Sequence, residues 1–232
     1  MRIAIISDVH SNLEALKQVI KKLKTIGYDE LICLGDIIGY GPDPEPCLDI
    51  IFEEAKYIIK GNHETAVVMP EQLVRFDKYA RESILWTLEN ISEKYIQLLS
   101  YLRDSLVYNG IKFVHSTPVN HKNWHYISNF RDADEYFKYM HENLCFIGHS
   151  HIAGIYIERL SKTLSPTTKA IINVGSVGQP RDGIRDASFG IFDMSTWTYM
   201  GGREKYNIEK TQDKILKTKL PSYLATRLSQ GV

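Results

Sequence analysis

The chain has 232 residues, of which 44% are hydrophobic, and its 28 Lys and Arg residues balance 28 Asp and Glu residues. This length and composition indicate one soluble domain with a sizeable core, and the lack of net charge argues against a general affinity for nucleic acid. Three cysteines without C-x-x-C spacing argue against a disulfide scaffold and favour an intracellular setting. The N-terminal apolar run is too short for a secretory signal or a membrane span, so we expect a cytoplasmic protein without a membrane partner.

The first 60 residues alternate between expected strands and helices. Ser11 and Glu14 form an S-x-x-E capping box that opens the first helix, and Gly27 ends it. Asp43 followed by Pro44 suits the N-cap and first position of a second helix. This β-α-β-α-β order predicts a mostly parallel sheet covered by helices. The expected strands are 3–7, 30–34 and 57–60, and the second helix is expected to run to about Glu54.

The pattern changes after the third strand. A helical insert is expected over about 71–104, and the Asn109-Gly110 pair between two apolar runs predicts a β-hairpin over 106–114. The charged stretch of about 207–232 is a predicted C-terminal helical extension, which can pack on the domain or on a second subunit of a homo-oligomer. We expect a single domain over residues 1–232. A short helix is expected at 132–142, and further strands around 144–147, 153–159, 170–174, 188–193 and 197–201.

Five short segments hold nearly all of the metal-binding potential, and each follows a predicted strand directly. They are Asp8-Val9-His10, Gly35-Asp36, Gly61-Asn62-His63-Glu64, His115 and Gly148-His149-Ser150-His151. Side chains at strand ends converge on one edge of such a sheet. Carboxylates, imidazoles and one amide suit Mn²⁺, Fe²⁺ and Zn²⁺, and the lack of a thiolate excludes a structural zinc finger. The D-x-H and H-x-H pairs can each address one metal or bridge two, and Asp36 suits a bridge.

Each segment alone would arise by chance in many chains, whereas their order and strand context are specific. The set D-x-H, G-D, G-N-H-[DE], H and G-H-x-H resembles the calcineurin-like metallophosphoesterase superfamily over about residues 1–200. The segments 34–44 and 173–183 are similar to a small bacterial and archaeal branch of predicted phosphodiesterases. The resemblance implies an α/β fold, a four-layer α-β-β-α sandwich of two mixed sheets, in agreement with the order of elements above.

The resemblance also implies a hydrolase that acts on phosphoric ester bonds through two divalent ions, Mn, Fe or Zn. Two such ions can share a water and lower its pKa, which yields hydroxide at neutral pH. His63 is then the candidate general acid for the leaving alkoxide, and its alternative is a structural histidine in a turn. By motif, the first metal would be bound by Asp8, His10 and His151, both metals by Asp36, and the second by Asn62, His115 and His149.

Three further features are candidates for substrate contact. Arg181 lies in a Gly/Pro-rich loop that suits a phosphate contact, and its alternative is a solvated loop charge. Asn12 could orient His10 or touch substrate, or it could hydrogen bond at the helix end. An aromatic insert could be a lid that stacks on a base or aryl group, or a satellite of core packing. It comprises His121, Trp124, His125 and Tyr126.

The chain departs from the superfamily at Ser11 and Ser116, where glycine is common, and at Val174, where proline is frequent. The segment 36–39 lacks the Asp-Arg-Gly continuation of Ser/Thr protein phosphatases, which disfavours that role.

We expect a phosphodiesterase or phosphomonoesterase acting on a small phosphate ester, with a nucleotide among the candidates. A superfamily nuclease is disfavoured by the neutral composition and the lack of a separate DNA-binding domain. A non-catalytic metal-stabilised interaction module, like the small retromer subunit, is disfavoured because that relative lacks the histidine equivalent to His63.

Overall fold

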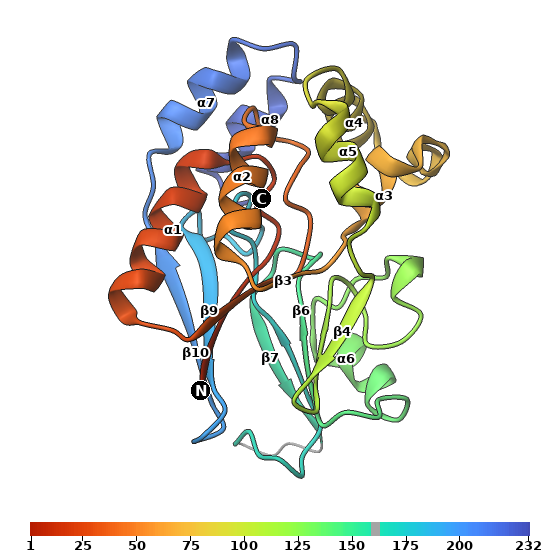
Figure 1. Ribbon diagram of the computed structural model, residues 1–232, viewed down its shortest axis with the longest axis vertical. Coiled ribbons are helices and arrows are strands. Elements are labelled where there is room, and N and C mark those ends of the chain that lie inside the picture. The colour runs from red at the N-terminus through yellow and green to blue at the C-terminus, as the bar shows by residue number, and fades with distance from the viewer. Residues whose placement is uncertain (159–162) are drawn as a thin grey trace.

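The computed structural model describes residues 1–158 and 163–232 and contains two mixed five-stranded sheets (Figure 1). The first sheet has the order β10-β9-β1-β2-β3. The strands β1, β2 and β3 run parallel, as the βαβ pattern predicts, and β9 and β10 add two antiparallel strands at one edge. The strands are β1 (Arg2–Ile6), β2 (Glu30–Cys33), β3 (Tyr57–Ile58), β9 (Ala187–Asp193) and β10 (Thr198–Glu204).

The second sheet has the order β4-β5-β6-β8-β7. Its centre is parallel and both edge pairs are antiparallel. The predicted hairpin is confirmed as β4 and β5, and both turn residues, Asn109 and Gly110, have positive φ angles of 51° and 75°. Two positive φ values in a two-residue loop match the twist of the strands. The strands are β4 (Ser105–Tyr108), β5 (Ile111–Val114), β6 (Leu144–Ile147), β7 (Gly154–Ile157) and β8 (Ala170–Asn173).

The two sheets pack face to face, and helices cover the outer face of each. Along β1, Ile3 and Ile5 point into the cluster between the sheets, whereas Ala4 and Ile6 join the cluster beneath the helices. On the other side, Phe137 of α6 (Phe130–Phe137) packs on the outer face of the second sheet. The inter-sheet cluster includes Ile3, Ile5, Ile32, Phe113, Phe146 and Ile172. The expected four-layer α-β-β-α sandwich is therefore confirmed.

The start of the first helix differs from the prediction. The N-cap of α1 (Leu13–Ile26) is Asn12, whose Oδ1 accepts a hydrogen bond from the Ala15 N–H at 3.2 Å. Ser11 has a left-handed φ of 52°, and its buried hydroxyl has no partner among the described residues. The predicted S-x-x-E capping box is therefore wrong, because the backbone of Ser11 turns its side chain away from the helix end. Gly27 ends α1 as expected, with a φ of 84°.

The helical insert is more interrupted than expected. Pro70 cannot continue the hydrogen bonding of the preceding helix, and Asp77 caps a new one by accepting from the Ala80 N–H. The strand predicted at 57–60 is shorter, with a two-residue β3. The helix predicted at 132–142 is α6, which begins two residues earlier because Asn129 caps it and which ends at Phe137. The end of the strand predicted at 153–159 lies outside the described residues. The remaining helices are α2 (Pro44–Glu54), α3 (Asn62–Val68), η1 (Pro70–Arg75), α4 (Lys78–Glu89), α5 (Glu93–Ser100) and η2 (His121–Asn123).

The C-terminal extension packs against its own chain beside α1, α2 and α4 (Figure 1). It forms α7 (Ile208–Leu216), α8 (Tyr223–Thr226) and η4 (Arg227–Ser229). Ile215 and Leu224 bury themselves against Tyr40, and the Lys214 ammonium pairs with Glu14 of α1 and with Asp43 at the start of α2. Among residues 1–158 and 163–232, no helix combines the length and the apolar character that a membrane crossing requires.

Candidate metal centre

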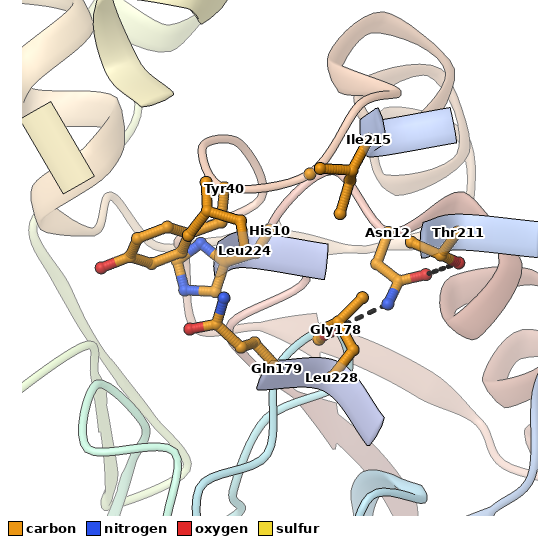
Figure 2. A pocket seen from close by; sticks show the side chains of 10 residues that line it. His10, Asn12, Tyr40, Gly178, Gln179, Thr211, Ile215, Leu224 and Leu228 are labelled. Atoms are coloured by element: carbon orange, nitrogen blue, oxygen red, sulfur yellow. Dashed lines mark hydrogen bonds between the residues drawn. The ribbon is translucent and has the colours of Figure 1, made fainter. Parts of the chain in front are cut away.

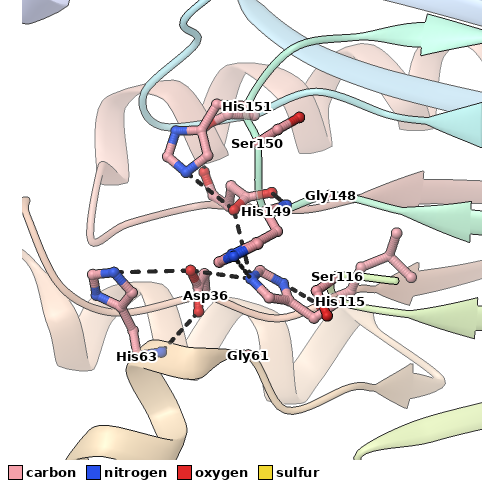
Figure 3. A network of polar contacts seen from close by, with 12 residues as sticks. Asp36, Gly61, His63, His115, Ser116, Gly148, His149, Ser150 and His151 are labelled. Carbon is pink, nitrogen blue, oxygen red and sulfur yellow. Dashed lines mark hydrogen bonds and ion pairs between the residues drawn. The ribbon is translucent and has the colours of Figure 1, made fainter. Parts of the chain in front are cut away.

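The polar segments singled out in the sequence meet at the carboxyl ends of β1, β2, β5 and β6 and at the start of α3 (Figure 3). Three groups of side chains each bring their ligand atoms within 4.8 Å of one another. His10 and Asp36 each belong to two of these groups, so the groups form one continuous cluster. The groups are Asp8, His10 and His151; His10, Asp36 and His63; and Asp36, His115 and His149.

The backbone of the cluster is held in an unusual conformation. Five of its residues have positive φ angles between 49° and 67°, a region that side chains other than glycine rarely adopt. Hydrogen bonds between the loops hold this geometry, as in the contact from the His10 N–H to the Asp36 carbonyl at 2.9 Å. Such conformations cluster at functional sites. The five residues are Asp8, His10, Asp36, His149 and His151.

Four histidines of the cluster each have one ring nitrogen against a backbone carbonyl. A carbonyl only accepts, so that nitrogen carries a proton, and in a neutral ring the opposite nitrogen directs its lone pair into the cluster. Metal-bound histidines in proteins are oriented in this way. The contacts are His10 Nδ1 to Ile38 O at 3.1 Å, His115 Nδ1 to Leu34 O at 2.9 Å, His149 Nε2 to Trp124 O at 2.9 Å and His151 Nδ1 to Gln179 O at 2.6 Å.

Ring nitrogens of two histidine pairs consequently face one another. The Nε2 atoms of His10 and His151 lie 3.0 Å apart, and His115 Nε2 lies 3.2 Å from His149 Nδ1. Burial lowers the pKa of both His10 and His151, so both rings are neutral. If the His10 proton moved to Nε2, it could donate to His151 Nε2. The unprotonated Nδ1 of His10 would then face the Ile38 carbonyl oxygen, which is also repulsive. Either tautomer leaves one repulsive contact, which a cation bound between the rings would relieve.

Asp36 lies between the two histidine pairs. Its Oδ1 accepts from the His63 N–H at 2.9 Å, which fixes the carboxylate. Its Oδ2 faces His115 Nε2 at 3.2 Å and His10 Nε2 at 3.8 Å, one nitrogen from each pair. A single carboxylate oxygen is therefore directed at both ends of the cluster.

Two further oxygens fit a cation. Asp8 Oδ2 accepts from the His149 N–H at 2.9 Å. Asp8 Oδ1 is buried 3.2 Å from His151 Nε2, and it has no hydrogen-bond donor among the described residues while that nitrogen is unprotonated. Asn62 Oδ1 is likewise buried and without such a partner. Buried oxygens normally have a hydrogen bond, so their lack of one points to a missing cation. Carboxylate, imidazole and amide donors together suit a borderline divalent metal, and these His/Asp groups could hold such ions.

The electrostatics of the cluster agree with this. Burial alone would raise the pKa of Asp8 and Asp36, but neighbouring histidines hold both carboxyls below their usual range. Burial also opposes a charge on His115, yet mainly Asp36 raises its pKa to about 9. Without metal, the His115 proton therefore occupies the place of a cation at that end of the cluster. The neutral rings of His10 and His151 lack such a proton, so this pair is a stronger indication of a metal than the pair at His115.

His63 differs from the other histidines of the cluster. Its Nδ1 has no hydrogen-bond partner among the described residues and packs against Gly39, where an added Cβ would lie 2.1 Å from that atom. Its Nε2 lies 3.9 Å from Asp36 Oδ2 and faces the cluster. Burial lowers the pKa of His63 to about 4, against the attraction of Asp36. The ring therefore borders the cluster without a backbone clamp.

Glu64 is a positioning residue that stands out in the sequence only as part of the G-N-H-[DE] motif. Its buried carboxylate accepts from the N–H groups of Asp36 at 2.8 Å and Ile37 at 2.7 Å. It also accepts from the Gly61 N–H at 2.9 Å. This one side chain therefore joins the loop after β2 to the start of α3. The acidic fourth position of G-N-H-[DE] was the signal that could have identified it.

The two expected substrate contacts differ in their surroundings. Arg181 lies beside the cluster, where its guanidinium donates to Gln179 Oε1 at 2.7 Å and lies 5.6 Å from the centre of the Tyr40 ring. Its charge also contributes to the low pKa of His63, after burial and the charges of His151 and His115. Asn12 is buried and donates to the Gly178 carbonyl at 2.8 Å, in addition to capping α1. The geometry thus favours the helix-end alternative for Asn12.

The aromatic insert divides into two parts. Trp124 and Tyr126 approach the cluster, and the Tyr126 ring stacks on His149 with 4.4 Å between centroids and an interplanar angle of 6°. His125 points to the Tyr136 hydroxyl instead, at 3.4 Å. Ser116, which stands in place of a common glycine, donates through Oγ to the His121 carbonyl at 2.6 Å. That hydrogen bond fastens the insert to the strand that carries His115.

The C-terminal extension closes one side of the cluster (Figure 2). The cavity there measures about 10 Å³, which is at the lower limit for a single water. A substrate therefore has no room on this side. The residues around this cavity include His10, Asn12, Tyr40, Gln179, Thr211, Ile215, Leu224 and Leu228.

Comparison with known proteins agrees with the geometry. Residues 1–196 match the family model of the calcineurin-like phosphoesterase superfamily domain. The uncharacterized protein MJ0912 of Methanocaldococcus jannaschii is 38% identical over 241 residues, which cover 99% of this chain and 98% of that protein.

Solved structures agree as well. A metallophosphoesterase from Sphaerobacter thermophilus superposes with a TM-score of 0.88 at 34% identity, covering 100% of this chain and 99% of that one. The hypothetical protein PH1004 of Pyrococcus horikoshii OT3 shares the fold, with a TM-score of 0.83, 18% identity, and coverage of 100% and 98%. The chain belongs to the calcineurin-like phosphoesterase superfamily, and it is a hydrolase of phosphoric ester bonds.

Proposed function

We propose that this chain is a two-metal phosphodiesterase that hydrolyses a small phosphate diester. The observation that carries the proposal is the contact between His10 and His151 at 3.0 Å, which a cation would relieve, together with the Asp36 oxygen directed at both histidine pairs. The first ion would be held by Asp8, His10 and His151, the second by Asn62, His115 and His149, and both by Asp36.

Each residue then has a definite task. When bound, two divalent ions of Mn, Fe or Zn lower the pKa of a coordinated water and offset charge on the phosphate. The backbone carbonyls orient the histidines, and the Glu64 carboxylate holds the loop that carries Asp36. His63 delivers a proton from Nε2 to the leaving oxygen. An anionic phosphate beside His63 favours the imidazolium and so counteracts the effect of burial on its pKa.

A diester is favoured as substrate because the segments 34–44 and 173–183 are similar to a branch of predicted phosphodiesterases. A phosphodiester carries one negative charge, whereas a phosphomonoester carries about 1.5 to 2 at neutral pH. Arg181 is the cationic side chain that we assign to the phosphate, and it is already held by Gln179. Arg181 would add one positive charge to those of the two ions beside the bound phosphate.

Hydrolysis assays with metal-stripped protein, to which single metals are added back, test this function. We expect Mn²⁺, Fe²⁺ or Zn²⁺ to restore cleavage of bis-p-nitrophenyl phosphate and to restore cleavage of p-nitrophenyl phosphate less well. Asp36→Asn should lower the rate more than about 100-fold, because even residues that only orient metal ligands change activity by about 10- to 100-fold. Asp134→Asn, at an exposed position on α6, is the matched control. Protein that binds two ions and cleaves neither ester with any metal would refute the proposal.

A further inference from the structure

A second, larger cavity borders the cluster on the side that the C-terminal extension leaves open. It measures about 210 Å³ and includes Asn62 and His149 in its lining. These two residues are proposed ligands of the second ion, so a group attached to a phosphate at the metals would extend into this space. The remaining lining comes from the helical insert and the aromatic insert, together with Tyr40.

Aromatic side chains in the lining are fixed against rings of the cluster. Phe76 meets His63 edge to face, with 5.3 Å between centroids and an angle of 78°, and Tyr40 lies 4.8 Å from the same ring. Tyr126 stacks on His149, and Trp124 lies 6.2 Å from it. The aromatic rings are therefore set at defined positions relative to the phosphate site.

Hydrogen bonds join the two segments on either side of the cavity. The Arg75 guanidinium, from the helical insert, donates to the carbonyls of Lys122 at 3.4 Å and Asn123 at 3.2 Å in the aromatic insert. The next residue, Trp124, accepts from His149 Nε2 through its own carbonyl at 2.9 Å. The backbone at Trp124 is therefore held by His149, a proposed metal ligand, and its neighbour Asn123 is held by Arg75 of the helical insert. These contacts fix the indole and pre-organise the cavity for a ligand.

The size and lining of the cavity fit a planar aromatic ring. A cavity of about 150 Å³ in a protein core accommodates benzene, so 210 Å³ has room for a ring with polar substituents. Asp77 and Asn123 add polar groups to the lining, which suits a ring that carries hydrogen-bonding atoms. We propose that this cavity binds an aromatic group of the substrate, a nucleobase or an aryl ring, stacked on Trp124. The inference rests on the proposed function, since the phosphate at the metals brings the group here.

Binding to the Mn²⁺-loaded protein tests the inference by affinity, under conditions in which the monoester probes are hydrolysed slowly compared with the titration. The probes are adenosine 5′-monophosphate against ribose 5-phosphate, and phenyl phosphate against methyl phosphate, measured by titration calorimetry. Stacking of a base on an aromatic side chain corresponds to about 5- to 150-fold in affinity. We therefore expect at least one aromatic probe to bind about tenfold more tightly than its partner. A preference in the adenosine pair alone identifies a base as the occupant, and one in the phenyl pair alone identifies an aryl ring.

Variants at Trp124 test whether this side chain causes the preference for aromatic probes. Trp124→Leu keeps apolar bulk and should reduce the ratio to about 1, whereas Trp124→Phe keeps a ring and should preserve most of it. Tyr101→Ala removes an aromatic side chain that is 86% exposed and should change nothing. Equal binding of all four probes to the wild type would overturn the aromatic site and leave the metal site standing. Failure of all four to bind would overturn both, and an unchanged ratio in Trp124→Leu would overturn the stacking on Trp124.

Discussion

The Nε2 atoms of His10 and His151 lie 3.0 Å apart, although 141 positions separate the two residues in the chain. Both rings are neutral and held by backbone carbonyls, so the contact is unfavourable until a cation enters. Metal binding and folding should therefore be thermodynamically linked.

Removal of metal should lower the thermal stability. A ligand at 100 times its dissociation constant stabilises the folded state by about 2.7 kcal/mol, which corresponds to roughly 5–10 °C in a domain of this size. We expect chelation to lower the Tm of the wild type by this amount and that of His151→Ala by less than half of it. Scanning calorimetry with and without Mn²⁺ measures both shifts. His141→Ala, at an exposed position, should behave as the wild type, and a wild-type Tm insensitive to metal would contradict the linkage.

Loss of the His63 ring should slow turnover without loss of metal. In the described part of the chain no backbone carbonyl holds this ring, and its Nε2 faces the cluster 3.9 Å from Asp36 Oδ2. We expect His63→Ala to reduce kcat by about 10²–10⁴-fold for an ester with an alkyl leaving group. The loss should be smaller with p-nitrophenolate, because a good leaving group needs less protonation. Metal analysis of the same preparations distinguishes a general acid from a metal ligand. Loss of metal in His63→Ala would show that His63 is a ligand.

The substitution Glu64→Gln should destabilise the protein and lower its activity. Glu64 Oε2 accepts from Asp36 N–H and Gly61 N–H, whereas Oε1 accepts from Ile37 N–H. In the amide of Gln, an NH₂ group replaces one of these two oxygens. That NH₂ group would face backbone N–H donors and could not accept from them. An unsatisfied buried donor costs about 1–3 kcal/mol, so we expect a loss of about 1–3 kcal/mol in the free energy of unfolding.

Urea denaturation of metal-free protein measures the effect of Glu64→Gln. Glu89→Gln, at an exposed position of α4, is the control and should change the stability by less than about 0.5 kcal/mol. A Glu64→Gln variant as stable as this control would show that the carboxylate is dispensable for the loop.

The ion pairs of Lys214 should make the stability depend on acid pH. Burial opposes ionisation of Glu14, but hydrogen bonds from Lys214 and Lys210 lower its pKa below 4.5. A carboxyl with a depressed pKa stabilises the folded state above its unfolded pKa, and this contribution is lost as the pH falls below about 4.5. We expect Lys214→Met to be about 0.5–1 kcal/mol less stable than the wild type at pH 7, with the difference shrinking towards pH 3.

Urea denaturation across this pH range, on metal-free protein, follows the difference. Lys217→Met removes an exposed charge from the same helix end and should show no such trend. A difference between Lys214→Met and wild type that stays constant from pH 7 to pH 3 would exclude the ion pair with Glu14 as its origin.

Much of the fold was predictable because its signals are local. Asn109-Gly110 adopts the two positive φ angles that a tight hairpin requires, and alternating apolar residues in β1 place Ile5 on one face and Ile6 on the other. The interruptions within the helical insert were harder to predict. Apolar spacing continues across Phe76 and Asp77, so periodicity alone does not show that Asp77 begins a new helix.

The sequence by itself determined which polar residues meet, since each ligand segment follows a strand and the strand ends share one edge. Only the tertiary structure decided which atoms they present, because ring orientation depends on carbonyls that are distant in the chain, such as Trp124 O for His149. The same holds for Asn12, whose amide is held by Gly178 and by Thr211, residues at the far end of the chain. Local pattern thus specifies the elements and their order, whereas contacts between distant segments set the direction of each hydrogen bond.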